Sequence, residues 1–366
     1  MKTALVTGAS GFIGRQLVAA LTARGCRVRC LVRRTSSVRP LLRAGAELCF
    51  GDVTQPDALA SAVGDADVVF HAAGLTKTLR TDDLQRVNGQ GTWNVSRACA
   101  AQSHPPVLVV VSSLAAAGPA RPGAIRTESD APTPVSNYGR SKRAGEVAAE
   151  VWASQVPTTI VRPGVVFGPA NREMVDMFRT IATAGIHITP TYAPPPLSMI
   201  YVDDLVQILL LAAEKGTRIR REGGNGRPRF SPQGYYFACI SEYPTWADLG
   251  RMVAYSLGYR HVCVLNFVEP FLWMVAGINE LLSRLRGQPH PLSLDKIREA
   301  VASSWASSPE AVQRDLGFVP PQSLRQRLEQ TVDWYLRHRW ISTAGPVSRL
   351  LGVPDSVPKN RRLVTN

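Results

Sequence analysis

The chain has 366 residues, of which 45% are hydrophobic and 19% are charged, and its formal net charge is +14. This composition excludes wholesale disorder, and the length allows about two domains without a disulfide or a metal to hold them together. No apolar run reaches the ~18 residues of a spanning helix, and the apolar run at the N-terminus is too short for a secretory signal.

The cysteines favour a reducing compartment. They stand at positions 26, 30, 49, 99, 239 and 263, form no C-x-x-C pair and show no zinc-site spacing with histidines. Most of them fall within apolar segments. We therefore expect reduced, buried thiols, no metal site and a cytoplasmic protein.

The basic residues are mostly arginine, since only six of the 42 are lysine. This bias indicates genomic base composition rather than a nucleic-acid surface, so we expect no nucleic-acid partner. Two clusters stand out, a loop (Arg218, Arg220, Arg221, Arg227, Arg229) and a tail (Lys359, Arg361, Arg362). Dispersed solvated charge and attraction to anionic lipid or polyanions both stay open for them.

Residues 3–161 alternate strand-like and helix-like segments. The expected strands are 3–7, 27–32, 47–50, 67–70, 107–112 and 158–161, with helix-period segments such as 13–24 and 139–152 between them. This alternation predicts an α/β fold with a doubly wound parallel sheet.

The pattern changes after residue 162. We expect a helix over about 202–214, a flexible loop over 216–234, one more strand at 235–240 and a capped helix at 245–257. The rest, to about residue 340, is mostly helical.

One apolar segment, 267–285, needs its own interpretation. Its longest charge-free piece, 270–279, is too short to span a bilayer. It is either an amphipathic helix that packs inside the protein or lids a pocket, or a peripheral membrane contact near 267–286 helped by Arg284 and Arg286.

The segment TGASGFIG (7–14) follows the first strand at once and opens a helix. Gly8 permits a tight turn, Gly11 lets the backbone approach a pyrophosphate, and Gly14 lets the helix pack close to the strand. The helix N-terminus adds unpaired N–H groups and a partial positive charge. The pattern predicts a dinucleotide site formed by Gly8, Ser10, Gly11, Phe12, Ile13 and Gly14.

The end of the second strand distinguishes between cofactors. It reads LVRRTSS (31–37), without the carboxylate that would accept ribose hydroxyls. Arg33 and Arg34 suit a 2′-phosphate, so we expect NADP(H) rather than NAD(H). The alternative is that both arginines stack on the adenine or face solvent. Asp52 and Val53, after the third strand, are placed to meet the adenine.

The segment YGRSK (138–142) places a phenol and an ammonium four residues apart on one helix face. Because a free phenol is a poor base at neutral pH, a neighbouring lysine and a positive nicotinamide would favour its phenolate. Tyr138 could then exchange a proton with a substrate hydroxyl while Lys142 holds the nicotinamide ribose.

Two further polar residues complete this candidate set. Ser113, at the end of a strand, could hold the substrate oxygen beside the phenol, and Asn88 could tie Lys142 to a water chain. Taken alone, Tyr138 fits an ordinary helical surface better than a catalytic site. The order of all the motifs along the chain favours the catalytic interpretation.

These segments resemble the extended branch of the short-chain dehydrogenase/reductase superfamily, the NAD-dependent epimerase/dehydratase family. The resemblance covers roughly residues 1–340. Its motifs are TGASGFIG (7–14), GDV (51–53), VFHAAG (69–74), VNGQGT (87–92), VVVSSLAAAG (109–118), YGRSK (138–142), RPGVVFGP (162–169) and IYVDDL (200–205).

The resemblance implies Tyr138 as the catalytic acid/base, Lys142 as its activator, Ser113 as the partner of the substrate oxygen and Asn88 as the relay. The residues implied to line the cofactor are His71, Ala72, Ala73, Gly74, Pro163, Gly164 and Val165.

The resemblance also implies a Rossmann domain at 1–163, with contributions from about 198–241. A smaller, mostly helical substrate domain would follow at 164–197 and 242–342, with a loose tail at 343–366. A homodimer through helices at roughly 89–102 and 138–153 is a further implied feature.

Within this family the chain looks more like 3β-hydroxysteroid dehydrogenases and dihydroflavonol reductases than like nucleotide-sugar enzymes. The latter usually carry an asparagine where this chain has Val165. We therefore expect hydride exchange with a secondary alcohol or ketone of a small hydrophobic substrate, steroid-like or 3-oxoacyl-like. A nucleotide-sugar epimerase or dehydratase with a retained cofactor is the alternative, and a cofactor-sensing protein without activity is a third.

Overall fold

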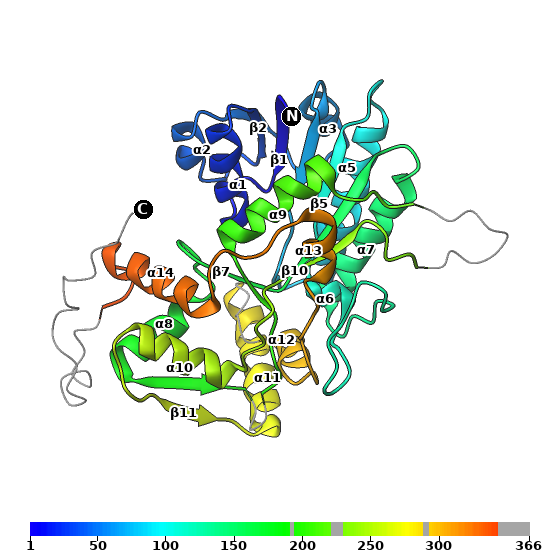
Figure 1. Ribbon diagram of the computed structural model, residues 1–366. Coiled ribbons are helices and arrows are strands. Elements are labelled where there is room, and N and C mark those ends of the chain that lie inside the picture. Colours follow the sequence, from blue (N-terminus) through cyan, green and yellow to red (C-terminus); the bar gives the residue numbers. More distant parts are fainter. Residues whose placement is uncertain (191–193, 221–229, 288–292, 343–366) are drawn as a thin grey trace.

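The computed structural model of the chain describes residues 1–190, 194–220, 230–287 and 293–342. Its centre is a seven-stranded sheet in the order β10-β6-β5-β4-β1-β2-β3, with neighbouring strands parallel (Figure 1). The strands are β1 (Thr3–Thr7), β2 (Arg27–Val32), β3 (Glu47–Phe50), β4 (Val68–His71), β5 (Val107–Val111), β6 (Thr158–Pro163) and β10 (Tyr235–Ala238).

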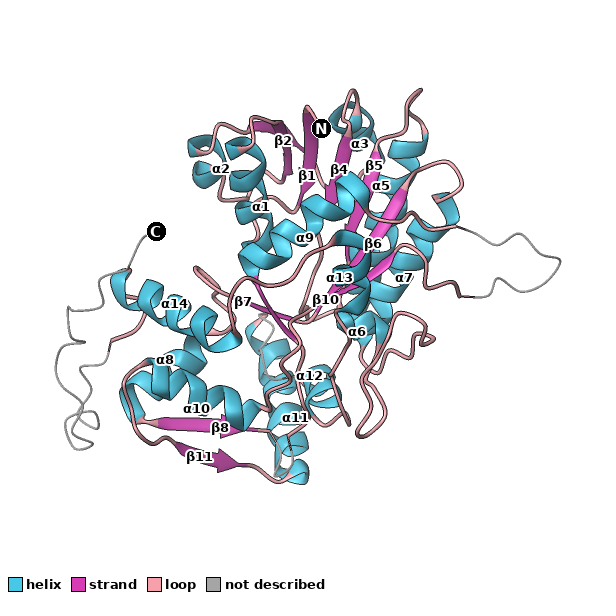
Figure 2. Ribbon diagram, in the orientation of Figure 1, coloured by secondary structure: helices cyan, strands magenta, loops and turns pink. Residues whose placement is uncertain are grey.

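Helices cover both faces of this sheet (Figure 2). One face carries α1 (Phe12–Ala23) and α9 (Val202–Lys215), with α2 (Arg39–Arg43) and α13 (Glu310–Leu316) nearby. The other face carries α3 (Pro56–Val63), α4 (Thr81–Leu84), the π-helical turn η1 (Gln85–Gln90), α5 (Gly91–Ala100) and α7 (Asn137–Trp152), while the short α6 (Leu114–Ala117) follows β5.

The strand side chains explain this arrangement. Val6 packs into the core shared with α1 and α9, whereas its neighbour Leu5 packs into the core shared with α3, α5 and α7. Side chains alternate across a strand, so a continuous apolar run supplies two buried faces at once. The expected doubly wound parallel α/β fold is confirmed.

A smaller part lies below the carboxyl ends of the strands in the view of Figure 1. It contains two parallel strand pairs, β7 (Val165–Phe167) with β9 (Met199–Tyr201) and β8 (Ile186–Thr189) with β11 (Cys263–Asn266). Its helices are α8 (Val175–Ala184), α10 (Trp246–Ser256), α11 (Glu269–Arg286), α12 (Leu294–Ala300) and α14 (Leu324–Arg337). This part is mostly helical, as expected, although the sequence did not reveal its short strands.

The domain boundaries stay a prediction, but the chain crosses between the two parts more than once. The strand β10 joins the large sheet beside β6, and α13 packs on α9 and β10. The middle of the expected loop at 216–234, namely residues 221–229, lies outside the described residues, as does the expected tail at 343–366.

Two expectations about individual side chains are wrong. Arg218 is not a solvated loop charge, because its guanidinium donates to the carbonyls of Ala212 and Ala213 and so caps the end of α9. Cys30, Cys99 and Cys239 are buried free thiols, as expected, but Cys263 is exposed on the edge strand β11.

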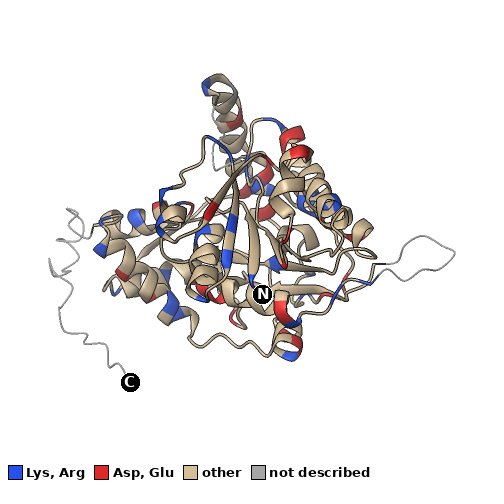
Figure 3. Ribbon diagram, turned by 90° about the horizontal axis from the view of Figure 1, so that it is seen from above, with Lys and Arg blue, Asp and Glu red and all other residues tan. Residues whose placement is uncertain are grey.

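Charged residues of both signs are spread over the described elements (Figure 3).

Candidate active site

The glycine loop joins β1 to α1 with the steric demands that its spacing predicts. Gly8 has a φ of +69°, and a Cβ there would lie 2.5 Å from the backbone nitrogen of Ala73. A Cβ on Gly14 would lie 2.2 Å from the carbonyl oxygen of Gly8. Only glycine fits at both positions, so the first turn of α1 sits directly against the loop.

The N-terminus of α1 is open to an anion. Its N-cap, Gly11, has no side chain to cap the first N–H groups, and the first turn contains no acidic residue. Arg15 adds a guanidinium to that turn, and its Nε has no hydrogen-bonding partner among the described residues. The donors and the positive helix end fit the pyrophosphate of a dinucleotide.

Arg33 and Arg34 follow β2 at the same edge of the sheet. Both are exposed, and the Arg34 guanidinium lies 5.7 Å from the centre of the Phe50 ring. Within the described chain, no carboxylate pairs with either arginine. The Oδ1 atom of Asp52 accepts hydrogen bonds from the N–H and hydroxyl of Thr54, and Val53 packs in the core.

The helix α7 lies unusually close to its neighbours. A Cβ on Gly145 would stand 2.4 Å from the carbonyl oxygen of Asn88, and one on Gly139 would stand 2.4 Å from that of Ala115. Because both positions are glycine, α7 packs tightly on η1 and α6. This packing brings Tyr138 and Lys142 to the polar residues at the ends of β4 and β5.

Tyr138 lies in the first turn of α7, partly buried. Loss of hydration raises the pKa of the phenol above its usual value, whereas the charge of Lys296 and a hydrogen bond with Ser113 act to lower it. The carboxylates of Glu299 and Glu173 also act to raise the phenol pKa. Ser113 and Tyr138 are therefore neighbours, as the sequence suggested.

Lys142 lies one turn further along α7. Its Nζ donates a 2.7 Å hydrogen bond to the carbonyl of Val111, at the end of β5. Burial lowers the pKa of this lysine to about 8, against attraction from Glu146. A Cβ on Gly74 would be 3.5 Å from Nζ, so the ammonium lies between the ends of β4 and β5.

The two serines after β5 have different surroundings. Ser112 is buried and donates a 2.6 Å hydrogen bond to Glu146. Ser113 caps α6 by accepting from the N–H of Ala115, and it meets Tyr138. Only Ser113 therefore lies where a substrate oxygen could meet the phenol.

Asn88 lies in the π-helical turn, buried. Its amide accepts from the N–H of Leu75 and donates to the Leu75 carbonyl and to the hydroxyl of Ser141. The side chain thus joins the loop after β4 to α7. It makes no direct hydrogen bond to Lys142, and the expected link through a water chain stays a prediction.

The remaining residues expected to line the cofactor lie at the same edge of the sheet. Ala72, Ala73 and Gly74 follow β4, Pro163 ends β6 and Val165 begins β7. His71 differs from the expectation, because its buried ring bonds to the hydroxyls of Thr7 and Thr92. Burial lowers the pKa of His71 to about 3, which keeps the ring neutral.

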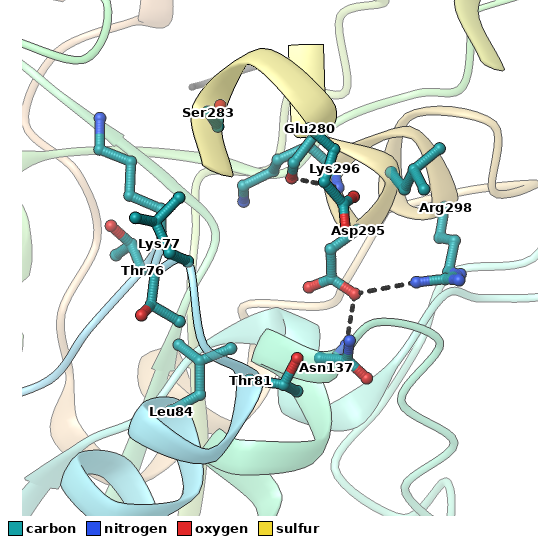
Figure 4. A pocket seen from close by; sticks show the side chains of 14 residues that line it. Thr76, Lys77, Thr81, Leu84, Asn137, Glu280, Ser283, Asp295, Lys296 and Arg298 are labelled. Atoms are coloured by element: carbon teal, nitrogen blue, oxygen red, sulfur yellow. Dashed lines mark hydrogen bonds and ion pairs between the residues drawn. The ribbon is translucent and has the colours of Figure 1, made fainter. Parts of the chain in front are cut away.

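No sequence motif indicated the contribution of α12 to the site. Asp295, Lys296 and Glu299 reach the N-terminus of α7, and a pocket of about 190 Å³ opens beside them. The loop after β4 forms the opposite wall with Thr76 and Lys77, and α11 closes the pocket with Glu280 and Ser283 (Figure 4). Contacts between residues so distant in sequence leave no local pattern to detect.

The profile of the NAD dependent epimerase/dehydratase family matches residues 4–223. The chain belongs to this family. Its residues at the glycine loop and at the ends of β4 and β5 fit the nicotinamide cofactor that the family name states.

Individual relatives extend the match beyond the family region. A ceramide reductase of Caulobacter vibrioides is 31% identical, over 92% of this chain and 95% of the relative. The human 3 beta-hydroxysteroid dehydrogenase type 7 is 26% identical over 90% of this chain and 94% of its own, so the expected likeness to hydroxysteroid dehydrogenases is confirmed.

The fold also matches solved members of the family. The UDP-glucose 4-epimerase of Thermotoga maritima has a TM-score of 0.71 and 20% identity, covering 92% of this chain and 99% of that one. At this identity the likeness concerns the fold alone.

Proposed function

We propose that this family member reduces a ketone on a lipid-like substrate, or oxidises the matching secondary alcohol, with NADP(H). The observation that carries the proposal is the meeting of Tyr138 with Ser113, one turn from Lys142 and beside the glycine loop. This arrangement suits proton transfer at an oxygen atom of the substrate.

Each residue of this cluster has a separate task. When bound, the nicotinamide supplies or accepts the hydride. Tyr138 donates a proton to the ketone oxygen during reduction and accepts it back during oxidation. The Ser113 hydroxyl donates a hydrogen bond to the same oxygen, and Lys142 holds the cofactor ribose and favours the phenolate.

The preference for NADP(H) rests on Arg33 and Arg34. Both guanidiniums are exposed at the end of β2, and neither has a carboxylate partner in the described chain. A 2′-phosphate would give them one, whereas no acidic side chain follows β2 to bind free ribose hydroxyls.

Two observations support a hydrophobic substrate. A ceramide reductase is among the relatives that match this chain over nearly its full length, and ceramides are lipids. The helix α11, which closes the pocket near Tyr138, exposes a stripe of large apolar side chains on its outer side. They are Phe271, Met274, Ile278, Leu281 and Leu285, with exposed fractions of 40, 54, 52, 62 and 77%.

We infer that this stripe contacts an anionic lipid surface. None of the described helices is long and apolar enough to cross a membrane. The stripe contains no acidic residue, Arg286 is exposed at its end, and the net charge of +14 favours anionic headgroups. The side chain of Arg284, also expected to help, lies outside the described residues.

Vesicle flotation tests the membrane contact. The chain should float with vesicles containing an anionic phospholipid, and an Ile278→Ser, Leu281→Ser variant should not. The matched control is Leu42→Ser with Val319→Ser, which removes exposed apolar side chains elsewhere. Equal flotation of the two variants would rule out a specific contact through α11.

A ketone panel tests the enzymatic proposal. NADPH consumption is followed with a long-chain 3-oxo amide, a 3-oxosteroid, a short polar ketone and UDP-glucose. Turnover of the long-chain or steroid ketone, lost in Tyr138→Phe, supports the proposal. Tightly retained NAD together with activity on UDP-glucose alone would instead identify the nucleotide-sugar alternative. The expected homodimer through α5 and α7 stays a prediction.

A further inference from the structure

The helix α12 caps the helix that carries Tyr138. The carboxylate of Asp295 accepts hydrogen bonds from the backbone N–H groups of Asn137 (2.6 Å) and Tyr138 (3.0 Å). Figure 4 shows Asp295 pointing at Asn137 from across the pocket wall. The first turn of α7 is therefore held by a residue of the smaller part of the chain.

A second contact fixes the same junction. The Ser136 hydroxyl accepts from the N–H of Gly139 and donates a 2.6 Å hydrogen bond to Glu299. The other carboxylate oxygen of Glu299 accepts from Lys296 at 2.8 Å. Glu299 thus connects the cap of α7 with the ammonium of Lys296.

Lys296 brings a positive charge to the tyrosine ring. Its Nζ lies 5.2 Å from the ring centre of Tyr138, within the range of a cation–π contact. A cation at this distance stabilises a phenolate more than a neutral phenol. Unlike Lys142, it reaches the tyrosine from another part of the fold.

The charges that act on Tyr138 come from two segments. Lys296 and Glu299 belong to α12, and Glu173 precedes α8, while the Ser113 hydroxyl is uncharged. The two carboxylates oppose ionisation of the phenol. Removing Lys296 would leave them without a cation from α12.

We propose that Lys296 is a positioning residue that holds the Tyr138 ring and sets the pH at which its proton is exchanged, with Asp295 and Glu299 fixing α12 against α7. The proposal rests on the role given to Tyr138 under the proposed function. In this proposal the smaller part of the chain contributes directly to the proton exchange at Tyr138.

Direct titration of Tyr138 tests this without a substrate. Ultraviolet difference spectra of tyrosinate are recorded for the wild type against Tyr138→Phe, and for Lys296→Gln against Lys296→Gln with Tyr138→Phe. We expect the Tyr138 titration to move to higher pH by about one unit in the Lys296→Gln background. An unchanged titration overturns the proposal whatever the substrate is.

The pH profile of alcohol oxidation provides the second readout. With a long-chain secondary alcohol and NADP, the profile of kcat should move to higher pH in Lys296→Gln and Lys296→Met, with about a tenfold loss at neutral pH. Lys296→Arg should restore most of the wild-type profile. NADPH affinity should be unchanged, because Lys296 contacts the tyrosine rather than the glycine loop.

A matched control separates this effect from a loss of charge in general. Lys215→Met removes an exposed lysine at the end of α9 and should leave both profiles unaltered. A uniform loss of kcat in Lys296→Gln without a change in the pH dependence would show that the residue acts only structurally. Absence of any Tyr138-dependent turnover in the wild type would contradict the proposed function. The direct titration would still show whether Lys296 affects the ionisation of Tyr138.

Discussion

The guanidinium of Arg162 lies fully inside the protein, paired with the carboxylate of Glu146. Its Nε and Nη2 atoms donate to the two carboxylate oxygens at 2.8 and 2.7 Å, and both side chains are 0% exposed. Ser112 and Arg143 donate to the same carboxylate. This pair joins β6 to α7, the helix that carries Tyr138 in its first turn.

Removing one partner of this pair should strongly reduce the stability of the fold. In Glu146→Ala the Arg162 charge would stay buried without its counter-charge, and we expect unfolding free energy to fall by about 3–5 kcal/mol. Urea denaturation measures the change. The exposed pair of Arg179 and Asp176 provides the control, since Arg179→Met should cost less than about 1 kcal/mol. Equal effects at the two sites would contradict this account.

Tyr138→Phe should abolish most of the turnover and leave the cofactor site intact. Losing the proton donor should lower kcat by about 10²–10⁴-fold, while the dissociation constant of NADPH stays close to that of the wild type. Steady-state kinetics and fluorescence titration measure the two quantities. Tyr255→Phe, at an exposed tyrosine of α10, is the control. Retained turnover in Tyr138→Phe would exclude this residue as the acid/base.

Arg33→Asp should weaken NADPH binding and spare NADH. A lost charge-assisted contact to the 2′-phosphate corresponds to about a 10- to 100-fold rise in the NADPH dissociation constant. Arg43→Asp changes net charge equally at an exposed position of α2 and should have little effect. If both variants weaken NADPH binding to the same extent, Arg33 contributes only through the overall charge of the protein and not through a contact with the 2′-phosphate.

His71 should make the fold sensitive to acid. Burial lowers the pKa of its ring from 6.5 to about 3, so below pH 6.5 the unfolded chain binds a proton that the folded chain does not. The contribution of the neutral His71 ring to the unfolding free energy is fully present above pH 6.5, the pKa in the unfolded chain. It falls by about 1.4 kcal/mol per pH unit as the pH drops from 6.5 toward 3. Urea denaturation should show that the unfolding free energy changes less between pH 7 and pH 5 in His71→Gln than in the wild type. The exposed His104→Gln should behave as the wild type does.

The sequence predicted the large sheet well because its central strands bury apolar side chains on both faces, although the edge strand β3 is only partly buried. It also located the glycine loop, whose spacing is a steric requirement at Gly8 and Gly14. The short strands of the smaller part were not predicted, because β8 and β11 have only four residues each and several of these are exposed or polar.

The candidate site was predictable only where a motif is local. Tyr138 and Lys142 are one helical turn apart, so their shared face follows from spacing. The choice between Ser112 and Ser113 depends on Glu146, which no local pattern indicates. The same holds for Asp295 and Lys296, whose tertiary contacts with α7 join segments far apart in the chain.

Transfer of deuterium from labelled NADPH tests the central proposal most directly. The chain is given NADPH labelled at the transferable C4 position and a long-chain 3-oxo amide or 3-oxosteroid, and the product is analysed by mass spectrometry. We expect one deuterium on the new carbinol carbon with the wild type and at least about a hundredfold slower transfer with Tyr138→Phe. The proposed function is contradicted if none of these ketones acquires deuterium while a UDP-sugar is converted with no net use of NADPH.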